Sequence, residues 1–155
     1  MIITKMTLPY VAQVAAIETE CFGRDAWSEK SVASELENKL ALWLVALDGD
    51  TVAGYVGSQT VMDETDMMNV AVTAAYRRRG IAEELVKELV EQLKRIGSHS
   101  LTLEVRASNE PARKLYDKMG FQQVGLRKNY YRNPKEDACI LRKEFEYEQD
   151  QTLQN

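Results

Sequence analysis

The stretch that decides the fold is Val70-Ala71-Val72, followed after a short connection by Arg77-Arg78-Arg79-Gly80-Ile81-Ala82. The first three residues end an apolar, β-branched segment, which favours a strand. Gly80 opens a long segment of helical periodicity, so a strand leads directly into a helix. The first amides of a helix lack intrahelical acceptors, and the helix dipole adds partial positive charge there. With three arginines beside it, this junction predicts a site for an anion such as pyrophosphate.

The helix after Gly80 is the clearest in the chain. Its apolar residues recur at helical spacing from Ile81 through Leu85 and Leu89 to Ile96, and charged residues fill the opposite face. Gly97 stands where a left-handed residue is expected to end a helix. The anion site is therefore expected at the start of a long amphipathic helix.

Outward from this junction, the sequence alternates between strand and helix patterns. Strands are expected at Met1–Met6, Ala41–Leu47, Thr51–Met62, Met67–Val72, Leu101–Val105, Phe121–Arg127 and Ala138–Phe145. Helices are expected after Pro9, after the candidate cap Ser28, at Ile81–Ile96 and at Glu110–Met119. Loops are expected at Cys21–Trp27 and Tyr130–Pro134. The order predicts a mixed α/β (α+β) fold in which helices cover a central sheet.

Length and charge limit the classes of protein that fit. The chain has 155 residues, enough for one domain, which we expect at 1–146 with a flexible polar tail at 147–155. A formal net charge of −4 argues against broad binding of nucleic acid. No apolar run approaches the ~20 residues of a membrane span, and the N-terminus lacks a signal-peptide pattern. We expect a cytoplasmic protein without direct nucleic-acid or membrane contacts.

The sequence also excludes several catalytic classes. Its only histidine, His99, lies between two serines after a helix end and is expected to be an exposed turn residue. Cys21 and Cys139 form no CxxC pair, and the HExxH, GxxxxGK[ST] and GxSxG patterns are absent, so no metal is expected. The arginine junction remains as a candidate site. Charge alone leaves two interpretations of it open, an anion-binding site and a solvated basic surface.

Two runs of sequence resemble a known family. Arg77-x-x-Gly80-x-Ala82 matches the R/Q-x-x-G-x-G/A signature of the GNAT superfamily of N-acetyltransferases. The run from Leu103 to Asn109, Leu-Glu-Val-Arg-Ala-Ser-Asn, with Leu115-Tyr116 and Gly120-Phe121 after it, resembles the RimI-type branch. That branch acetylates the N-terminal alanine of a small-subunit ribosomal protein. Further segments that resemble it are Trp27–Lys30, Met68–Val72 and Asn129–Tyr131, so the similarity spans about residues 1–145.

The resemblance implies the GNAT fold, with a mostly antiparallel sheet of about seven strands and about four helices, and acetyl-coenzyme A as donor. In this family two neighbouring parallel strands splay apart around the pantetheine arm, here Met67–Val72 and Leu101–Val105. Backbone of the first strand would pair with the arm, and one N–H would stabilise the oxyanion. The implied donor-binding residues are Val70, Ala71, Val72, Arg77, Arg78, Arg79, Gly80, Ile81, Ala82, Glu83 and Asn109. Asn109 also fits a helix cap.

The resemblance also implies an acid and a base. Glu104 matches the general base, which is needed because an α-amine, with a pKa of about 7.7–8.0, is largely protonated at neutral pH. Strand alternation alone also allows Glu104 to be an outward-facing residue paired with Arg106. Tyr116 matches the general acid that protonates the departing thiolate. Its helical spacing equally allows a core tyrosine beside Leu115 and Met119.

The acceptor is expected between the Phe22–Trp27 and Asn129–Tyr131 loops, where this family builds its peptide groove. Trp27, Tyr130 and Tyr131 are the candidate substrate-binding residues, or else they anchor their loops in the core. Two departures from the RimI pattern fall here: Gly-Arg-Asp-Ala before Trp27, and Arg132-Asn133 inserted before Pro134.

The expected reaction is direct acetyl transfer to a protein N-terminus in a ternary complex, by a monomer or weak dimer. Two alternatives stay open, namely acetylation of a small-molecule amine and non-catalytic binding of acetyl-coenzyme A.

Overall fold

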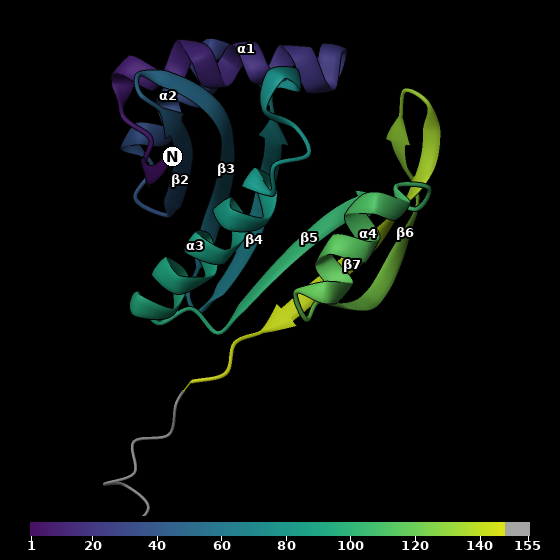
Figure 1. Cartoon of the computed structure of the whole chain (residues 1–155). Coiled ribbons are helices and arrows are strands. Elements are labelled where there is room, and N and C mark those ends of the chain that lie inside the picture. Colours follow the sequence, from purple (N-terminus) through teal and green to yellow (C-terminus); the bar gives the residue numbers. More distant parts are fainter. Residues whose placement is uncertain (148–155) are drawn as a thin grey trace, which may run out of the picture.

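The computed structural model describes residues 1–147, so the tail expected at 147–155 lies outside the described residues apart from Tyr147. Seven strands form one sheet in the order β1-β2-β3-β4-β5-β7-β6 (Figure 1). The strands are β1 (Ile2–Lys5), β2 (Ala41–Asp48), β3 (Thr51–Val61), β4 (Glu64–Val72), β5 (Ser100–Arg106), β6 (Gln122–Arg132) and β7 (Lys135–Glu144). The α-helices are α1 (Val11–Phe22), α2 (Glu29–Ser34), α3 (Ile81–Arg95) and α4 (Glu110–Lys118). The predicted fold class is confirmed.

The sheet is antiparallel except between its two central strands. β4 and β5 run parallel, and they pair only from Glu64 to Asp66, opposite Ser100 to Thr102. Beyond that point the two strands diverge, as Figure 1 shows. A shift in the β3–β4 register beside Gly57 adds a bulge to β4, and bulges increase local bend and twist. The sheet therefore opens at its middle, on the side where β4 ends.

Two hydrophobic cores lie on opposite faces of the sheet. α3 and α4 pack over one face, where α3 buries Leu85, Leu89 and Leu93 against the strands. α1 and α2 pack over the other face, where Val14 and Val32 lie with residues of β2 and β3. In β5, Leu101, Leu103 and Val105 are buried in the α3–α4 core, while Thr102, Glu104 and Arg106 are half-buried on the other face. This confirms the predicted alternation.

Two predicted loop boundaries beside the site are wrong. A loop was expected to begin at Cys21, but α1 continues to Phe22 and a 3-10 turn, Gly23–Asp25, follows. A loop was expected from Tyr130 to Pro134, but β6 continues to Arg132 and β7 begins at Lys135, so the turn is only Asn133–Pro134. A bulge hides this extension in the sequence. The β6–β7 register shifts between Arg127 and Tyr131, and Asn129 has a φ of 54°, which breaks the strand alternation. Tyr130 and Tyr131 therefore belong to a long hairpin.

Candidate active site

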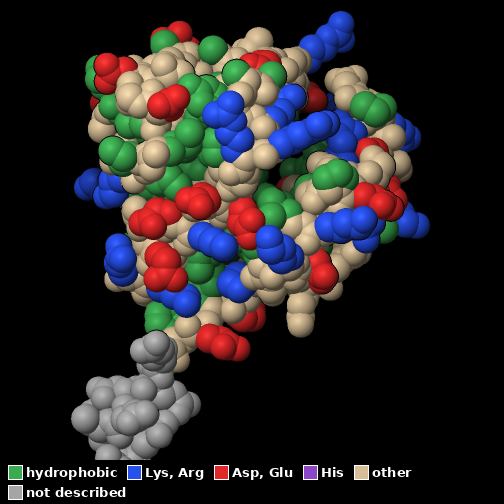
Figure 2. Space-filling view, viewed as in Figure 1, with side chains coloured by type: hydrophobic (Ala, Val, Ile, Leu, Met, Phe, Trp, Pro, Cys, Tyr) green, Lys and Arg blue, Asp and Glu red, His purple; other side chains and the backbone are tan. Residues whose placement is uncertain are grey.

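The largest described cleft lies where β4 and β5 diverge. It has a volume of about 990 Å³ and is lined by Met67–Val72 of β4, Leu103–Arg106 of β5, residues of α4, the β6–β7 hairpin, and the end of α1. Figure 2 shows the hollow between the part of the molecule that carries α3 and the part that carries α4, with basic side chains along its upper rim. The divergence predicted for Met67–Val72 and Leu101–Val105 thus forms a real opening.

The start of α3 forms one corner of this cleft. Gly80 precedes the helix with a φ of 75°, and a Cβ placed there would meet no atom within 4 Å. The first hydrogen bond of the helix runs from the Glu84 amide to the Gly80 carbonyl, so the three amides before Glu84 lack intrahelical acceptors. No side chain within the described residues caps them. A smaller hollow of about 210 Å³, lined by Arg78, Gly80 and Ala82 among others, opens here. The corner can therefore accept an anion.

The three arginines of this junction have different surroundings. Arg77 is anchored: its Nε donates to the Val72 carbonyl at 3.1 Å and its Nη2 lies 3.2 Å from the Glu20 carboxylate on α1. The guanidinium of Arg79 lies 5.2 Å from the centre of the Tyr76 ring. Arg78 adopts a φ of 65° and forms no ion pair within residues 1–147. Arg77 thus fixes the loop to α1 and β4, and Arg78 is the least committed cation.

Glu83 is the one acidic residue among the predicted donor-binding set. Its carboxylate lies 3.1 Å from Lys118 of α4 and 3.5 Å from Lys87. The hydrogen bond and charge of Lys118 hold the pKa of Glu83 below its usual range. Its charge is thus neutralised across the two helices, which lowers its repulsion of an anion at the α3 amides.

Asn109 begins α4 as a helix cap. Its Oδ1 accepts a hydrogen bond from the Ala112 amide at 3.2 Å. The predicted cap is therefore confirmed. Asn109 also lines the cleft, and its predicted contact with the donor stays a prediction.

Tyr116 lies in the α3–α4 core with its ring edge-on to Phe121, and it also lines the cleft. The residue is 4% exposed, and burial raises its pKa to about 12. Its hydroxyl forms no hydrogen bond within the described residues. Unlike Trp43 Nε1 and Ser100 Oγ, it is not a fully buried polar atom without a partner. The core position allowed by the helical spacing is therefore confirmed. Tyr116 also lines the cleft, and its role as general acid stays a prediction.

Glu104 lines the cleft from the face of β5 opposite Tyr116's core. The ion pair with Arg106 that strand alternation allowed is not the one formed, because Glu104 Oε1 lies 3.1 Å from Arg127 Nε on β6. Glu104 also affects its neighbours. Burial, followed by the charges of Glu104 and Glu64, raises the pKa of Asp66 at the last paired position of β4. Glu104 is therefore a partly exposed carboxylate next to the opening of the sheet.

Arg106 instead holds the β6–β7 hairpin. It donates to the Pro134 carbonyl at 2.8 Å and the Asn133 carbonyl at 3.2 Å, and it pairs with Glu136 at 3.3 Å. Its guanidinium lies 4.2 Å from the centre of the Tyr131 ring. Burial, followed by the charge of Glu104, raises the pKa of Tyr131 to about 12. Tyr130 and Tyr131 line the cleft as predicted, on a hairpin that Arg106 fixes.

Trp27, like Arg79, is a predicted site residue that lines neither the cleft nor the smaller hollow at the start of α3. Its ring packs edge-on against Trp43 instead, with 5.3 Å between the two ring centres. This geometry matches the alternative interpretation of a core anchor, while Phe22 at the end of α1 and Asp25 in the turn after it do line the cleft. This segment therefore reaches the cleft through residues other than Trp27.

Sequence reasoning missed Glu18, which is completely buried beneath the cleft wall. A signal was present, since Glu18 continues the apolar stripe of α1 from Val11, Val14 and Ile17. A carboxylate in such a stripe needs buried donors.

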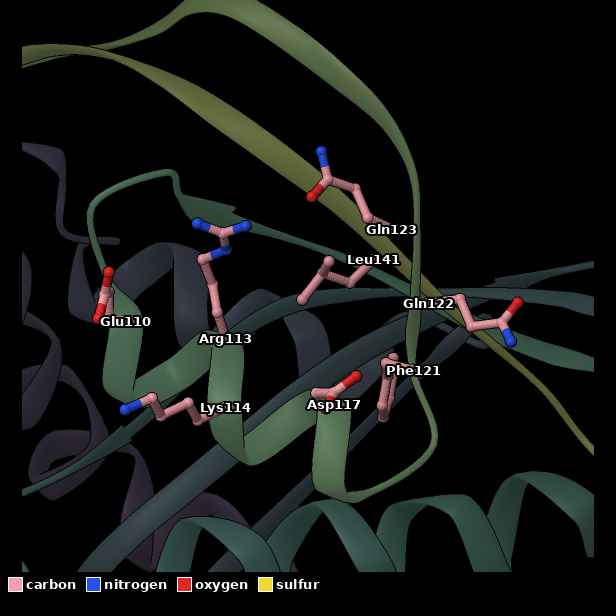
Figure 3. Close-up of a pocket in the computed structure, with 8 residues that line it drawn as sticks. All are labelled: Glu110, Arg113, Lys114, Asp117, Phe121, Gln122, Gln123 and Leu141. Atoms are coloured by element: carbon pink, nitrogen blue, oxygen red, sulfur yellow. The ribbon is translucent and has the colours of Figure 1, made fainter.

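A second cavity, of about 560 Å³, lies on the opposite side of α4. Figure 3 shows Arg113, Lys114 and Asp117 projecting from α4, and Gln122 and Gln123 from β6. No predicted site residue lines it.

Within residues 1–147 no group of three or more His, Cys, Asp or Glu side chains is arranged to hold a metal ion. None of the helices in this range has both the length and the apolar run that a membrane crossing requires.

Comparison with known proteins agrees with this geometry. The family described as the acetyltransferase (GNAT) family matches residues 11–121. The chain belongs to this family and is an acetyltransferase that uses acetyl-coenzyme A, which confirms the resemblance drawn from the sequence.

The relatives are more specific. A Bacillus subtilis (strain 168) protein named "Putative ribosomal protein bS18-alanine N-acetyltransferase" is 39% identical over 140 residues, 90% of this chain and 92% of that protein. The Escherichia coli (strain K12) ribosomal protein bS18-alanine N-acetyltransferase is 37% identical over 117 residues, 74% of this chain and 78% of that protein. The crystal structure of the ribosomal-protein-S18-alanine N-acetyltransferase from Escherichia coli superposes with a TM-score of 0.85 at 31% identity, covering 96% of both chains.

Proposed function

We propose that this chain transfers the acetyl group of acetyl-coenzyme A to a protein N-terminal α-amine, and that its acceptor is the N-terminal alanine of ribosomal protein bS18. The observation that carries the proposal is the shared cleft at the opening of the sheet, which Glu104 and Tyr116 both line. The names of the similar proteins from Bacillus subtilis and Escherichia coli support this acceptor.

The donor would bind along the edge of β4 that no longer pairs with β5. Backbone groups of Val70, Ala71 and Val72 lie beside the opening and would pair with the amides of the pantetheine arm. The pyrophosphate would lie at the start of α3, near the amides of Ile81 and Ala82 and the Arg78 side chain. This arrangement leaves the thioester between β4 and β5.

The proton transfers would then run in opposite directions. Glu104 would accept a proton from the amine while nitrogen bonds to the thioester carbon, directly or through one water. As the carbon–sulfur bond breaks, Tyr116 would donate its proton to the departing sulfur, a role that suits a phenol with a pKa of about 12. Before the reaction, Arg127 must leave Glu104 or share it with the incoming amine, because the two are paired at 3.1 Å.

The acceptor peptide would enter between the end of α1 and the β6–β7 hairpin. Phe22, Asp25, Tyr130 and Tyr131 line that side of the cleft. A ribosomal protein acceptor supports a reaction in the cytoplasm, and the proposal includes no direct contact with nucleic acid or membrane and no metal. The proposed active form is a monomer or a weak dimer.

A mass-spectrometric acetylation assay tests this proposal. Purified protein and acetyl-coenzyme A are incubated with the N-terminal peptide of bS18, the same peptide with an acetylated N-terminus, peptides with other first residues, and small polyamines and aminoglycosides. Acetylation of the free Ala-starting peptide, with far less product from the small amines, is the expected result. Preferential acetylation of a small amine would contradict the proposed acceptor, and no acetylation of any amine would favour a binding module.

A further inference from the structure

The buried carboxylate of Glu18 connects α1 to the cleft wall. Glu18 is 0% exposed, and its Oε1 accepts hydrogen bonds of 2.6 Å from both the Tyr55 hydroxyl and Asn69 Nδ2. Its Oε2 accepts from the Trp27 backbone amide at 3.2 Å. All three donors are neutral, and Glu18 forms no ion pair among the described residues. A buried anion without a cation is costly, so its retention calls for an explanation.

Asn69 is the member of this network that reaches the cleft. It lines the opening beside Val70, next to the bulge in β4 and beyond the last residue paired with β5. A carboxylate can only accept hydrogen bonds, and Nδ2 is the only donor atom of an asparagine side chain. Glu18 therefore fixes the amide orientation, with the nitrogen towards the core. The oxygen is the atom left for the cleft, and it accepts no hydrogen bond within residues 1–147.

Asn69 and Glu104 approach the cleft from the same face of the sheet. Asn69 bonds to α1, which covers the face opposite α3 and α4. Glu104 lies on that same face of β5, because its neighbours Leu103 and Val105 are buried under α3 and α4. Two hydrogen-bond acceptors, an amide oxygen and a carboxylate, thus border the opening where the amine that receives the acetyl group would arrive.

We propose that Asn69 Oδ1 binds the α-amine of the acceptor, with Glu18 as the residue that positions it; this rests on the proposed transfer to an α-amine. An attacking primary amine carries two N–H groups and one lone pair. If one N–H points to Asn69 and the other to Glu104, the lone pair is directed at the thioester carbon.

The proposal predicts a specific dependence on the second N–H. A peptide that starts with N-methylalanine has only one N–H when its neutral amine attacks, so it cannot satisfy both acceptors. Wild-type protein is expected to use it at least about tenfold less efficiently than the alanine peptide, beyond any steric effect of the methyl group. In Asn69→Ala, kcat/KM for the alanine peptide is expected to fall by roughly 10–100-fold, and the additional N-methyl penalty is expected to disappear.

The experiment measures kcat/KM for both peptides in wild type, Asn69→Ala and Tyr55→Phe. Tyr55→Phe is the matched control, because it removes a different donor from the same Glu18 oxygen, and Tyr55 does not line the cleft. It is expected to keep the wild-type N-methyl penalty. Equal penalties in wild type and Asn69→Ala would overturn the proposal, and so would an equal reduction of the penalty in Tyr55→Phe.

Folding and the proposed function are checked separately. Circular dichroism and calorimetric binding of acetyl-coenzyme A report whether each variant folds. If Asn69→Ala does not fold, Asn69→Ser, whose hydroxyl can still donate towards Glu18, replaces it and is judged by the same criterion. Failure of wild-type protein to acetylate the alanine peptide would reject the proposed function itself, whereas normal turnover with an unchanged N-methyl penalty would reject only the role of Asn69.

Discussion

The two sides of the cleft are built from different parts of the polypeptide. The proposed donor side consists mainly of backbone: the unpaired edge of β4 and the first amides of α3, shaped by Gly80. The proposed acceptor side consists of side chains held by long-range contacts, such as Glu104 with Arg127 and Arg106 with Tyr131. Backbone recognition tolerates changes in most side chains, whereas the acceptor side depends on individual ones. Substitutions on the two sides should therefore separate donor affinity from acceptor turnover.

The largest effect is expected on the acceptor side, from Glu104→Gln. The substitution keeps the shape of the side chain but removes the proposed base, so kcat for an Ala-starting peptide should fall by roughly 10²–10⁴-fold. Affinity for acetyl-coenzyme A, measured by calorimetry, should stay near that of the wild type. Arg127→Gln is the control, because it removes the partner of Glu104 and leaves the base. Unchanged turnover in Glu104→Gln would show that another group accepts the proton.

On the donor side, Gly80→Glu should lower the affinity for acetyl-coenzyme A by roughly 10²-fold or more. A carboxylate beside the α3 amides repels the pyrophosphate, and a φ of 75° strains any residue with a Cβ. Gly97→Glu is the matched control, since Gly97 has a φ of 87°, equally open surroundings, and lies beyond the other end of α3. Calorimetric titration of both variants separates strain from charge at the site. Equal affinities of the Gly80→Glu and Gly97→Glu variants for acetyl-coenzyme A would contradict a phosphate-binding role of this junction.

Tyr116→Phe is expected to lower kcat by roughly 10²-fold, the lower end of the range for a general acid. Burial disfavours the phenolate and raises the pKa of Tyr116 to about 12, so the hydroxyl keeps its proton throughout the neutral range. Loss of activity caused by Tyr116 ionisation should therefore appear only as the pH approaches about 12. A profile of kcat against pH tests this assignment. An alkaline decline well below that value that disappears in Tyr116→Phe would contradict the role of burial.

A smaller effect is expected from Arg106→Gln, about tenfold in KM for the peptide. Arg106 holds the Asn133–Pro134 turn and stacks on Tyr131, so its loss should loosen the acceptor wall without changing affinity for acetyl-coenzyme A. Arg142→Gln is the comparison, because that arginine pairs with Glu64 and Glu144 away from the hairpin turn. If Arg106→Gln changed the affinity for acetyl-coenzyme A as much as the KM for the peptide, Arg106 would affect the whole cleft rather than its acceptor wall.

The donor side was largely predictable because its determinants are local in sequence. A strand ending at Val72, a glycine at a helix start and the periodicity after Ile81 are each visible within a few residues, and the structure has all three. The divergence of β4 from β5 followed from the family resemblance. The sequence alone did not predict that Arg77 would be anchored to Glu20.

The acceptor side was less predictable because its contacts join residues that are distant in sequence. Glu104 pairs with Arg127 rather than the nearby Arg106, since antiparallel β5–β7–β6 pairing brings these strands together. The bulge near Asn129 concealed the strand that carries Tyr130 and Tyr131. Trp27 resembled a groove residue, and only tertiary packing placed it against Trp43.

Direct transfer requires that both sides of the cleft be occupied at once, which a bisubstrate analogue tests most directly. Coenzyme A joined through an acetyl-length linker to the α-amine of an alanine peptide should bind at least roughly 10²-fold tighter than coenzyme A alone, because one molecule fills both sides. Gly80→Glu should weaken both ligands, whereas Arg106→Gln should weaken only the analogue. Calorimetric affinities that are equal for the analogue and coenzyme A would contradict a cleft that holds donor and acceptor together.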